Sequence, residues 1–200
     1  CGAELKEFVE LLDIPFHQRR VCRGSVPETH PLHIAGPARG RAFRFADRFL
    51  CLGLRFDVLE QWGAWGPNKR FVQVSQSNEE IWPEIMTDIE AIGNVKATLK
   101  KLTEIAKRKY ADSLPQKSEW SEEIKNMKEK GEQRRKDRAE ELKSLMTLPG
   151  QLGAVPLSRI IADFVGEVIP ESTVILDSFT LSPWVSELLK PTVTGGVLDA

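Results

Sequence analysis

Two short stretches of this sequence place charged or hydroxyl side chains where a β-strand is expected to end. In the first stretch Gly53 closes an apolar run, and Leu54, Arg55, Phe56 and Asp57 follow it directly. The Arg55 guanidinium could bind a phosphate through two donors, and the Asp57 carboxylate could accept a hydrogen bond from a ribose hydroxyl. Alternatively, these two side chains pair with each other or with neighbours and only cap the end of the sheet. The sequence leaves both interpretations open.

The second stretch follows the apolar residues of STVILD and extends from Asp177 to Ser182. Its hydroxyl side chains precede a predicted helix start, where free backbone N–H groups can bind a diphosphate. Ser178 and Thr180 are therefore candidates for contact with a diphosphate. The alternative is that Ser178, Thr180 and Ser182 only satisfy the N–H groups of the helix start.

Patterns that would indicate a self-sufficient catalytic or metal site do not occur in the 200 residues. The sequence contains no GxSxG, HExxH, Walker or GxGxxG motif. The histidines His17, His30 and His33 lack metal-ligand spacing, and we expect them to pack in loops or at the surface. Trp62, Trp65 and Trp82 are expected to be packing residues and not a stacking platform. No residue is therefore predicted to be catalytic or to bind a metal.

Hydrophobic periodicity predicts the elements that hold the first stretch in place. Helices are predicted at 5–12, 39–46 and 94–107, and strands at 14–18, 48–53, 70–75 and 88–93. This alternation indicates an α/β fold, with a mainly parallel sheet and helices on both faces. Such sheets bind ligands outside the carboxyl ends of their strands, so we expect residues 54–57 at the binding edge.

The composition changes after residue 107. Residues 108–150 are polar, and Glu and Lys at helical spacing predict a solvated helix that links two domains and is weakened at Gly131. Acidic residues interleave its arginines, which disfavours nucleic acid binding. A helix at 157–165, a strand at 172–177 and a helix start at Ser182 predict a second βα portion. We expect this portion to stop after the glycine turn of VTGGVLDA without a closing element.

The bulk composition excludes several classes of protein. Lys and Arg total 28 and Asp and Glu total 29, so the net charge of -1 favours neither nucleic acid nor an anionic membrane as a partner. No apolar stretch reaches the roughly 20 residues that a membrane span needs. Cys1, Cys22 and Cys51 are too few and too scattered for a disulfide framework, which favours a reducing, cytoplasmic compartment.

Four stretches, in this order, resemble the central domain of thiamine-diphosphate-dependent enzymes of the acetolactate synthase class. They are GAELKEFVELLDIPF, VPETHPLH, FADRFLCLGLRFD and KRFVQVSQSNEEI, and the pattern AD..L.LG.RFD from Ala46 to Asp57 is the most specific piece. This class also includes oxalyl-CoA decarboxylases, 2-hydroxyacyl-CoA lyases and benzaldehyde lyases. IPESTVILDSFTLSPWVSELLK resembles, more weakly, the opening of the family's diphosphate-binding domain.

The resemblance implies three parts. Residues 1–107 would be a central nucleotide-binding-like domain without its first strand, 108–153 a linker, and 154–200 the beginning of a diphosphate-binding domain. The family's activating glutamate and its GDG…N magnesium motif do not occur in these residues. We therefore expect an excerpt of a larger enzyme, cut at both ends and inactive alone.

For the complete enzyme, the resemblance implies thiamine diphosphate and Mg²⁺ as cofactors and a 2-oxo acid or acyl-CoA as substrate. It also implies a homodimer or homotetramer, and FAD or ADP on the central domain at Leu54, Arg55, Phe56 and Asp57. The sequence departs from many relatives near Ser75 and Ser77, where they carry an aspartate, and at 179–180, where they carry Gly-Gln. The alternatives are a non-catalytic module that binds ADP, FAD or CoA, and a structural spacer domain.

Overall fold

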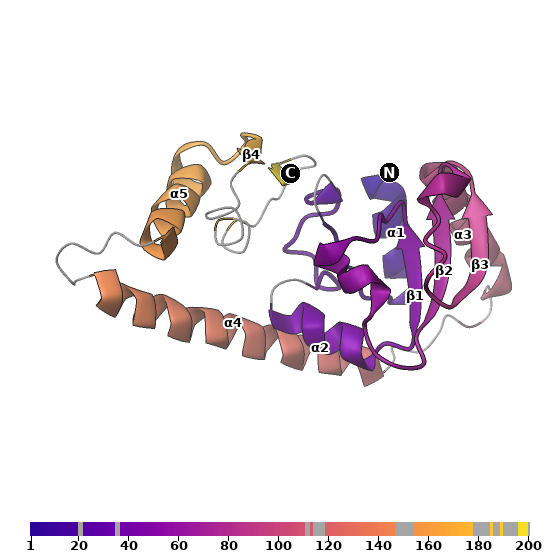
Figure 1. Cartoon of the computed structure of the whole chain (residues 1–200), viewed down its shortest axis with the longest axis horizontal. Coiled ribbons are helices and arrows are strands. Elements are labelled where there is room, and N and C mark those ends of the chain that lie inside the picture. Colours follow the sequence, from indigo (N-terminus) through magenta and orange to yellow (C-terminus); the bar gives the residue numbers. More distant parts are fainter. Residues whose placement is uncertain are drawn as a thin grey trace. The chain divides into compact units, whose positions relative to one another are not determined.

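The computed structural model describes most of the chain, and its contacts divide it into two units (Figure 1). The described residues are 1–19, 22–34, 37–110, 113, 119–146, 154–177, 185, 189 and 196–199. The first unit comprises Cys1, Ala3–Ile14 and Arg39–Ser118, and the second comprises Gly2, Pro15–Ala38 and Glu119–Ala200.

A three-stranded parallel sheet forms the centre of the first unit. Its strands are β1 (Arg48–Leu52), β2 (Arg70–Ser75) and β3 (Thr87–Ile92), in the order β1-β2-β3. The predicted strands at 48–53, 70–75 and 88–93 are confirmed. Gly53 N–H donates to the Val74 carbonyl at 2.7 Å and Gly93 N–H to the Ser75 carbonyl at 2.8 Å. The three strands therefore end at one common edge.

One face of this sheet carries an aromatic cluster. Alternation along the strands turns Phe49 and Cys51 of β1 and Phe71 of β2 to the same side, where Phe56 and Trp65 cover them. Helix α2 (Pro37–Phe45) adds a further ring to this side, because Phe43 lies 5.4 Å from Phe49 and 4.6 Å from Trp65 between ring centroids. The predicted helix at 39–46 is thus confirmed, and it helps to close this face.

Helices α1 (Gly2–Leu12) and α3 (Val95–Lys109) lie behind the strands in Figure 1. Phe8 and Val9 are the buried residues of α1, and Leu99 of α3 is fully buried. The Asn94 side chain caps α3 by accepting a hydrogen bond from Ala97 N–H at 3.0 Å. These helices and α2 confirm the predicted parallel α/β fold.

The strand predicted at 14–18 is wrong. Among the residues that the structure describes, this segment forms a single parallel bridge, between Phe16 and His33 in the second unit. Pro15 has no N–H to donate, and the Gln18 side chain takes both backbone groups of Val26, donating to its carbonyl at 2.7 Å and accepting from its N–H at 2.9 Å. The segment is therefore held by the two backbone hydrogen bonds of this bridge, Phe16 N–H to the Leu32 carbonyl and Ile34 N–H to the Phe16 carbonyl, and by the Gln18 side chain, without a strand ladder.

Helix α4 (Glu119–Met146) is not the fully solvated helix that its composition predicted. Ile124, Met127 and Gly131 lie on one face at helical spacing and are buried. Gly131 does not interrupt the helix, and a Cβ atom there would lie 3.9 Å from the Ala38 nitrogen. The apolar positions are too sparse among the charges to be recognised in the sequence.

The rest of the second unit contains α5 (Ala154–Val168) and two parallel strands, β4 (Val174–Leu176) and β5 (Val197–Asp199). No element was predicted for residues 197–199, which form β5 directly after the glycine turn. Strand β5 is only three residues long, and its partner lies more than twenty positions earlier, which leaves no local periodicity to detect. The helices α5 and α3 are confirmed near their predicted positions. Across the described residues, no helix is long and apolar enough to cross a bilayer.

Candidate functional site: the carboxyl edge of the sheet

Gly53 redirects the chain at the carboxyl end of β1. Its φ of 59° is left-handed, a conformation that glycine adopts without steric cost. The next side chains then alternate in exposure: Leu54 is half-buried against the aromatic cluster, and Arg55 is exposed. Phe56 is 2% exposed, with its ring 5.7 Å from Trp65 and 6.0 Å from Phe71. Leu54 and Phe56 therefore anchor the stretch, while Arg55 faces solvent.

Arg55 and Asp57 differ in how they are held. Within the described part of the chain, the Arg55 side chain makes no hydrogen bond or ion pair, so it does not pair with Asp57. Asp57 begins the turn η2 (Val58–Gly63), where its carbonyl accepts from Glu60 N–H at 3.1 Å and Trp62 N–H at 3.0 Å. Its Oδ1 also accepts from Glu60 N–H at 3.4 Å. Arg55 is thus an available anion-binding group, whereas Asp57 organises the loop.

The η2 turn has an unusual backbone. Gln61, Trp62 and Gly63 have φ values of 50°, 53° and 80°, all left-handed. A Cβ atom on Gly63 would come within 2.5 Å of Ile85 Cγ2, so this position requires glycine. The turn presents Trp62 half-exposed, with its ring stacked on Trp82 at 5.3 Å. Trp65 is a packing residue as predicted, but half of Trp62 faces solvent.

A partly buried ion pair that the sequence did not reveal supports this turn. Glu60 is 3% exposed, and its Oε2 accepts from Arg39 Nη2 at 2.7 Å. The backbone carbonyl of Glu60 also accepts from Trp65 Nε1 at 2.8 Å. Burial, with a further contribution from Glu60, raises the pKa of the Cys51 thiol to about 12, so this thiol stays protonated. Arg39 and Glu60 are 21 positions apart, and no local pattern links them.

The other two strands contribute small and polar residues to the same edge. Ser75 at the end of β2 is buried, and Gln76 N–H donates to Glu80 Oε2 at 3.1 Å. Glu80 belongs to the turn η3 (Asn78–Glu80), which places a carboxylate beside this strand end. Asn94 stands after β3 as the cap of α3. Arg55, Glu80 and Asn94 are therefore polar groups at a single edge of a parallel sheet.

The second candidate stretch lies mostly outside the described residues, including Ser178, Thr180 and Ser182. Its described flanks are the end of β4 at Leu176, the exposed Asp177, and Val185, whose carbonyl accepts from Leu189 N–H at 2.9 Å. A strand end followed by a helical turn is the arrangement that gathers free N–H groups for a diphosphate. Contact of Ser178 and Thr180 with a diphosphate stays a prediction. Among the described residues, no cluster of three or more His, Cys, Asp or Glu side chains could hold a metal ion.

A three-stranded parallel sheet with helices packed on it defines the chain as an α/β protein. Residues 1–102 match the family described as "Thiamine pyrophosphate enzyme, central domain", and the chain belongs to this family. The resemblance drawn from the sequence motifs is confirmed by this match. Thiamine diphosphate is the cofactor that membership of the family implies.

Three similar proteins illustrate the range of the family. Human (Homo sapiens) 2-hydroxyacyl-CoA lyase 1 is 30% identical over 148 residues, which cover 72% of this chain and 25% of that protein. Acetolactate synthase from Mycobacterium avium is 27% identical over 128 residues, covering 60% and 21%. Oxalyl-CoA decarboxylase from Escherichia coli (strain K12) is 27% identical over 114 residues, covering 56% and 20%. The chain thus spans about a quarter or less of the length of these relatives.

Proposed function

We propose that this chain is part of a thiamine-diphosphate- and Mg²⁺-dependent lyase or synthase that forms or cleaves a carbon–carbon bond next to a carbonyl. The observation that carries the proposal is the family match over residues 1–102, on a parallel sheet of the expected kind. The names of the relatives agree, since they describe a lyase, a decarboxylase and a synthase. The substrate class is a 2-oxo acid or an acyl-CoA.

The proposed roles of the three parts of the chain follow the predicted domains. Residues 1–107 form the central domain, 108–153 the linker, and 154–200 the beginning of the diphosphate-binding domain. Ser178 and Thr180 would contact the diphosphate, and the bound cofactor supplies the electron sink for the bond that breaks or forms. The activating glutamate and the GDG…N metal motif would come from residues beyond these 200, in a homodimeric or homotetrameric enzyme.

The test is an assay of the complete protein that carries these residues. Turnover of a 2-hydroxyacyl-CoA, oxalyl-CoA or a 2-oxo acid should require both thiamine diphosphate and Mg²⁺, and chelation by EDTA should abolish it. Turnover that persists after both cofactors are removed, or no turnover of any of the three substrate types, would contradict the proposal.

A second candidate function is nucleotide binding at the carboxyl edge. The exposed Arg55, which makes no hydrogen bond or ion pair with the described residues, favours it. Its guanidinium could bind a phosphate of ADP, FAD or CoA, and Asp57 or Glu80 could accept from a ribose hydroxyl. Isothermal titration of the chain with each ligand should show saturable heat, and Arg55→Ala should weaken binding about tenfold, as loss of a charge-assisted pair implies.

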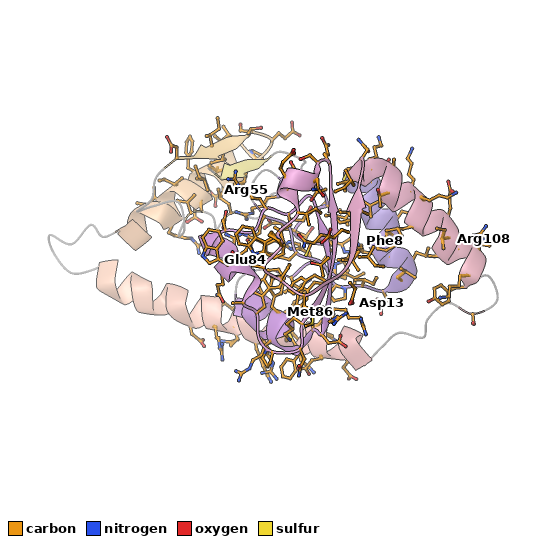
Figure 2. All side chains as sticks on the ribbon, turned by 45° about the vertical axis from the view of Figure 1, so that its right-hand side comes forward. Phe8, Asp13, Arg55, Glu84, Met86 and Arg108 are labelled. Atoms are coloured by element: carbon orange, nitrogen blue, oxygen red, sulfur yellow. The ribbon has the colours of Figure 1, made fainter. Side chains whose placement is uncertain are left out.

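Arg108 provides a matched control for this titration. It is an exposed arginine in the last turn of α3, whereas the carboxyl edge lies at the first turn of that helix. Figure 2 shows the side chains of Arg55 and Arg108 on well-separated parts of the unit. Arg108→Ala should leave the affinity unchanged. Absence of heat with all three nucleotides, or an equal loss in both variants, would rule out the Arg55 site.

A further inference from the structure

The amino ends of the three strands of the first unit meet at a second edge of the sheet, which we call the amino edge. Arg70 N–H donates to the Asp47 carbonyl at 2.9 Å, and Phe71 N–H donates to the Met86 carbonyl at 3.1 Å. These two bonds join the starts of β1, β2 and β3. Figure 2 shows Met86 and Arg55 near opposite ends of the sheet. The amino edge is therefore a separate surface from the carboxyl edge.

Two guanidinium groups at the amino edge share one carboxylate. Arg48 and Arg70 are direct partners in the register of β1 and β2. Both donate to Asp88, Arg48 from Nη1 to Oδ2 at 3.2 Å and Arg70 from Nη2 to Oδ1. The side chains of Arg48 and Arg70 are 73% and 43% exposed. One carboxylate thus faces two exposed cations, and it neutralises the charge of one of them.

The end of helix α2 brings more cations to the same edge. Lys69 Nζ donates to the carbonyls of Arg44, at 2.8 Å, and of Ala46, and it thereby fastens the end of α2 to the start of β2. Arg44 is exposed, and its side chain makes no hydrogen bond or ion pair within the described part of the chain. The guanidinium carbon of Arg41 lies 5.5 Å from the centre of the Phe45 ring. Arg41 and Arg44 are therefore held close to the pair of arginines on the sheet.

The amino edge combines excess positive charge with exposed apolar side chains. The segments 41–48, 69–70 and 86–88, which meet there, contain five cations and two carboxylates. Phe45 and Met86 lie among these charges and are 57% and 62% exposed. Arg44 in the last turn of α2 also complements the helix dipole, but that role does not account for two exposed apolar side chains. Negative charge and an apolar group are the features that complement this surface.

We propose that the amino edge is a docking surface for an acidic protein segment that carries apolar side chains. Carboxylates of the segment pair with the exposed guanidinium groups and steer the association, and its apolar side chains cover Phe45 and Met86. A nucleic acid fits this surface less well, because Asp47 and Asp88 lie among the cations and repel a continuous phosphate backbone. The inference rests on the charges and contacts of the first unit and not on the proposed enzyme activity.

Fluorescence anisotropy of two labelled peptides, titrated with the 200-residue chain, tests the docking surface. Both peptides are rich in glutamate, and one has leucines where the other has glycines. The leucine peptide should bind more tightly, and added salt should weaken both complexes. Arg44→Gln should raise the Kd of the leucine peptide about threefold, as loss of one exposed ion pair implies. Phe45→Ser should remove the difference between the two peptides.

Arg55→Gln is the matched control, because Arg55 is equally exposed and lies at the opposite end of the sheet. It should leave the Kd of both peptides unchanged. Absence of saturable binding, equal affinity for the two peptides, or an equal loss in the Arg44 and Arg55 variants would overturn the proposal. A single-stranded oligonucleotide of the same net charge should bind more weakly than the leucine peptide. Tighter binding of the oligonucleotide, weakened by Arg44→Gln, would identify a nucleic acid surface and would also overturn the proposal.

Discussion

Residues 54–57 show how individual side chains divide the work at the carboxyl edge. Leu54 and Phe56 turn toward the aromatic cluster, while Arg55 points to solvent and Asp57 begins the η2 turn. The packing of Leu54 and Phe56 fixes the path of the backbone. The fixed backbone holds the Arg55 guanidinium in solvent, where it can bind a ligand. Leu54, Phe56 and Asp57 therefore support the structure of the stretch, and Arg55 is its candidate binding group. Mutations at the first three positions should lower stability, whereas mutation of Arg55 should change ligand binding.

His33 is a second residue whose surroundings determine its chemistry. It is 1% exposed, with its ring 5.3 Å from Phe16 and 6.2 Å from His17. Burial lowers the pKa of His33 from its usual 6.5 to about 4. Glu28 acts in the opposite direction, and the cations of Lys128 and Arg23 add to the lowering. The imidazole is therefore neutral at pH 7.

We predict that stability falls as the pH drops from about 6.5 toward 4, because the unfolded chain binds a proton on His33 that the folded chain excludes. The contribution of neutral His33 to the free energy of unfolding is complete above the pKa of the unfolded state. The loss of this free energy approaches about 3 kcal/mol near pH 4. Urea unfolding of the wild type and of His33→Gln at about pH 7.5 and pH 4.5 measures it. The variant should lose clearly less stability between the two pH values, and an equal loss in both proteins would contradict the prediction.

Among the elements, β2 ties the sheet to the loop that follows it through one side chain. Gln73 is buried, donates to the Trp82 carbonyl at 2.9 Å and to Thr87 Oγ1 at 2.7 Å, and accepts from Trp82 N–H at 2.9 Å. The Gln73 side-chain amide thus binds both backbone groups of Trp82, as a neighbouring strand would, and this holds the loop against β2. This contact places Trp82 where Trp62 can stack on it.

Gln73→Leu should destabilise the chain by about 3 kcal/mol, because it keeps the volume but leaves the Trp82 N–H and carbonyl without partners. The free energy of unfolding in urea gives the measurement. Gln76→Leu is the matched control, since Gln76 is exposed and its substitution should cost no more than about 0.5 kcal/mol. Equal destabilisation by both substitutions would show that the Gln73 hydrogen bonds do not hold the loop.

The elements that the sequence predicted correctly are those whose evidence is local. The apolar runs at 48–53 and 70–75 and the periodic helix at 94–107 needed no knowledge of distant residues. Strand β5, in contrast, is defined by pairing with β4, and the absence of a strand at 14–18 depends on the contact of Gln18 with Val26. The position of Arg55 at the sheet edge was predictable from the end of an apolar run.

The other contacts of the candidate site could not be predicted from the sequence, because they also join residues that are far apart along the chain. The Arg39–Glu60 pair and the stacking of Trp62 on Trp82 join residues about 20 positions apart that share no periodic pattern. The left-handed backbone at Gln61 and Trp62 could not be foreseen either, because neither residue type requires it. Tertiary contacts, and not local propensity, build this part of the edge.

On the scale of the whole molecule, the chain combines a family match over residues 1–102 with a second unit that contains its own parallel strand pair. It covers 25% of the lyase, 21% of the synthase and 20% of the decarboxylase to which it is similar. The proposed chemistry therefore depends on groups that these 200 residues do not contain, above all a GDG…N motif.

Thiamine diphosphate with Mg²⁺ is accordingly expected to leave the Tm of the 200-residue chain unchanged. A ligand present at a hundredfold excess over its Kd would stabilise the folded state by about 2.7 kcal/mol, which a thermal-shift assay detects as several degrees. A matched titration with Mg²⁺ alone serves as the control. A clear rise in Tm with the cofactor would show that the chain already holds a complete binding site.

The buried Cys51 thiol can report the rate at which the first unit opens. Cys1 and Cys22 are exposed free thiols, whereas Cys51 is sealed under aromatic rings and remains protonated. An alkylating reagent should therefore modify two thiols at once and the third only when the sheet opens. The delay before the third adduct appears in a mass spectrum would time that opening without any added label, and immediate modification of all three would show that the sheet is open from the start.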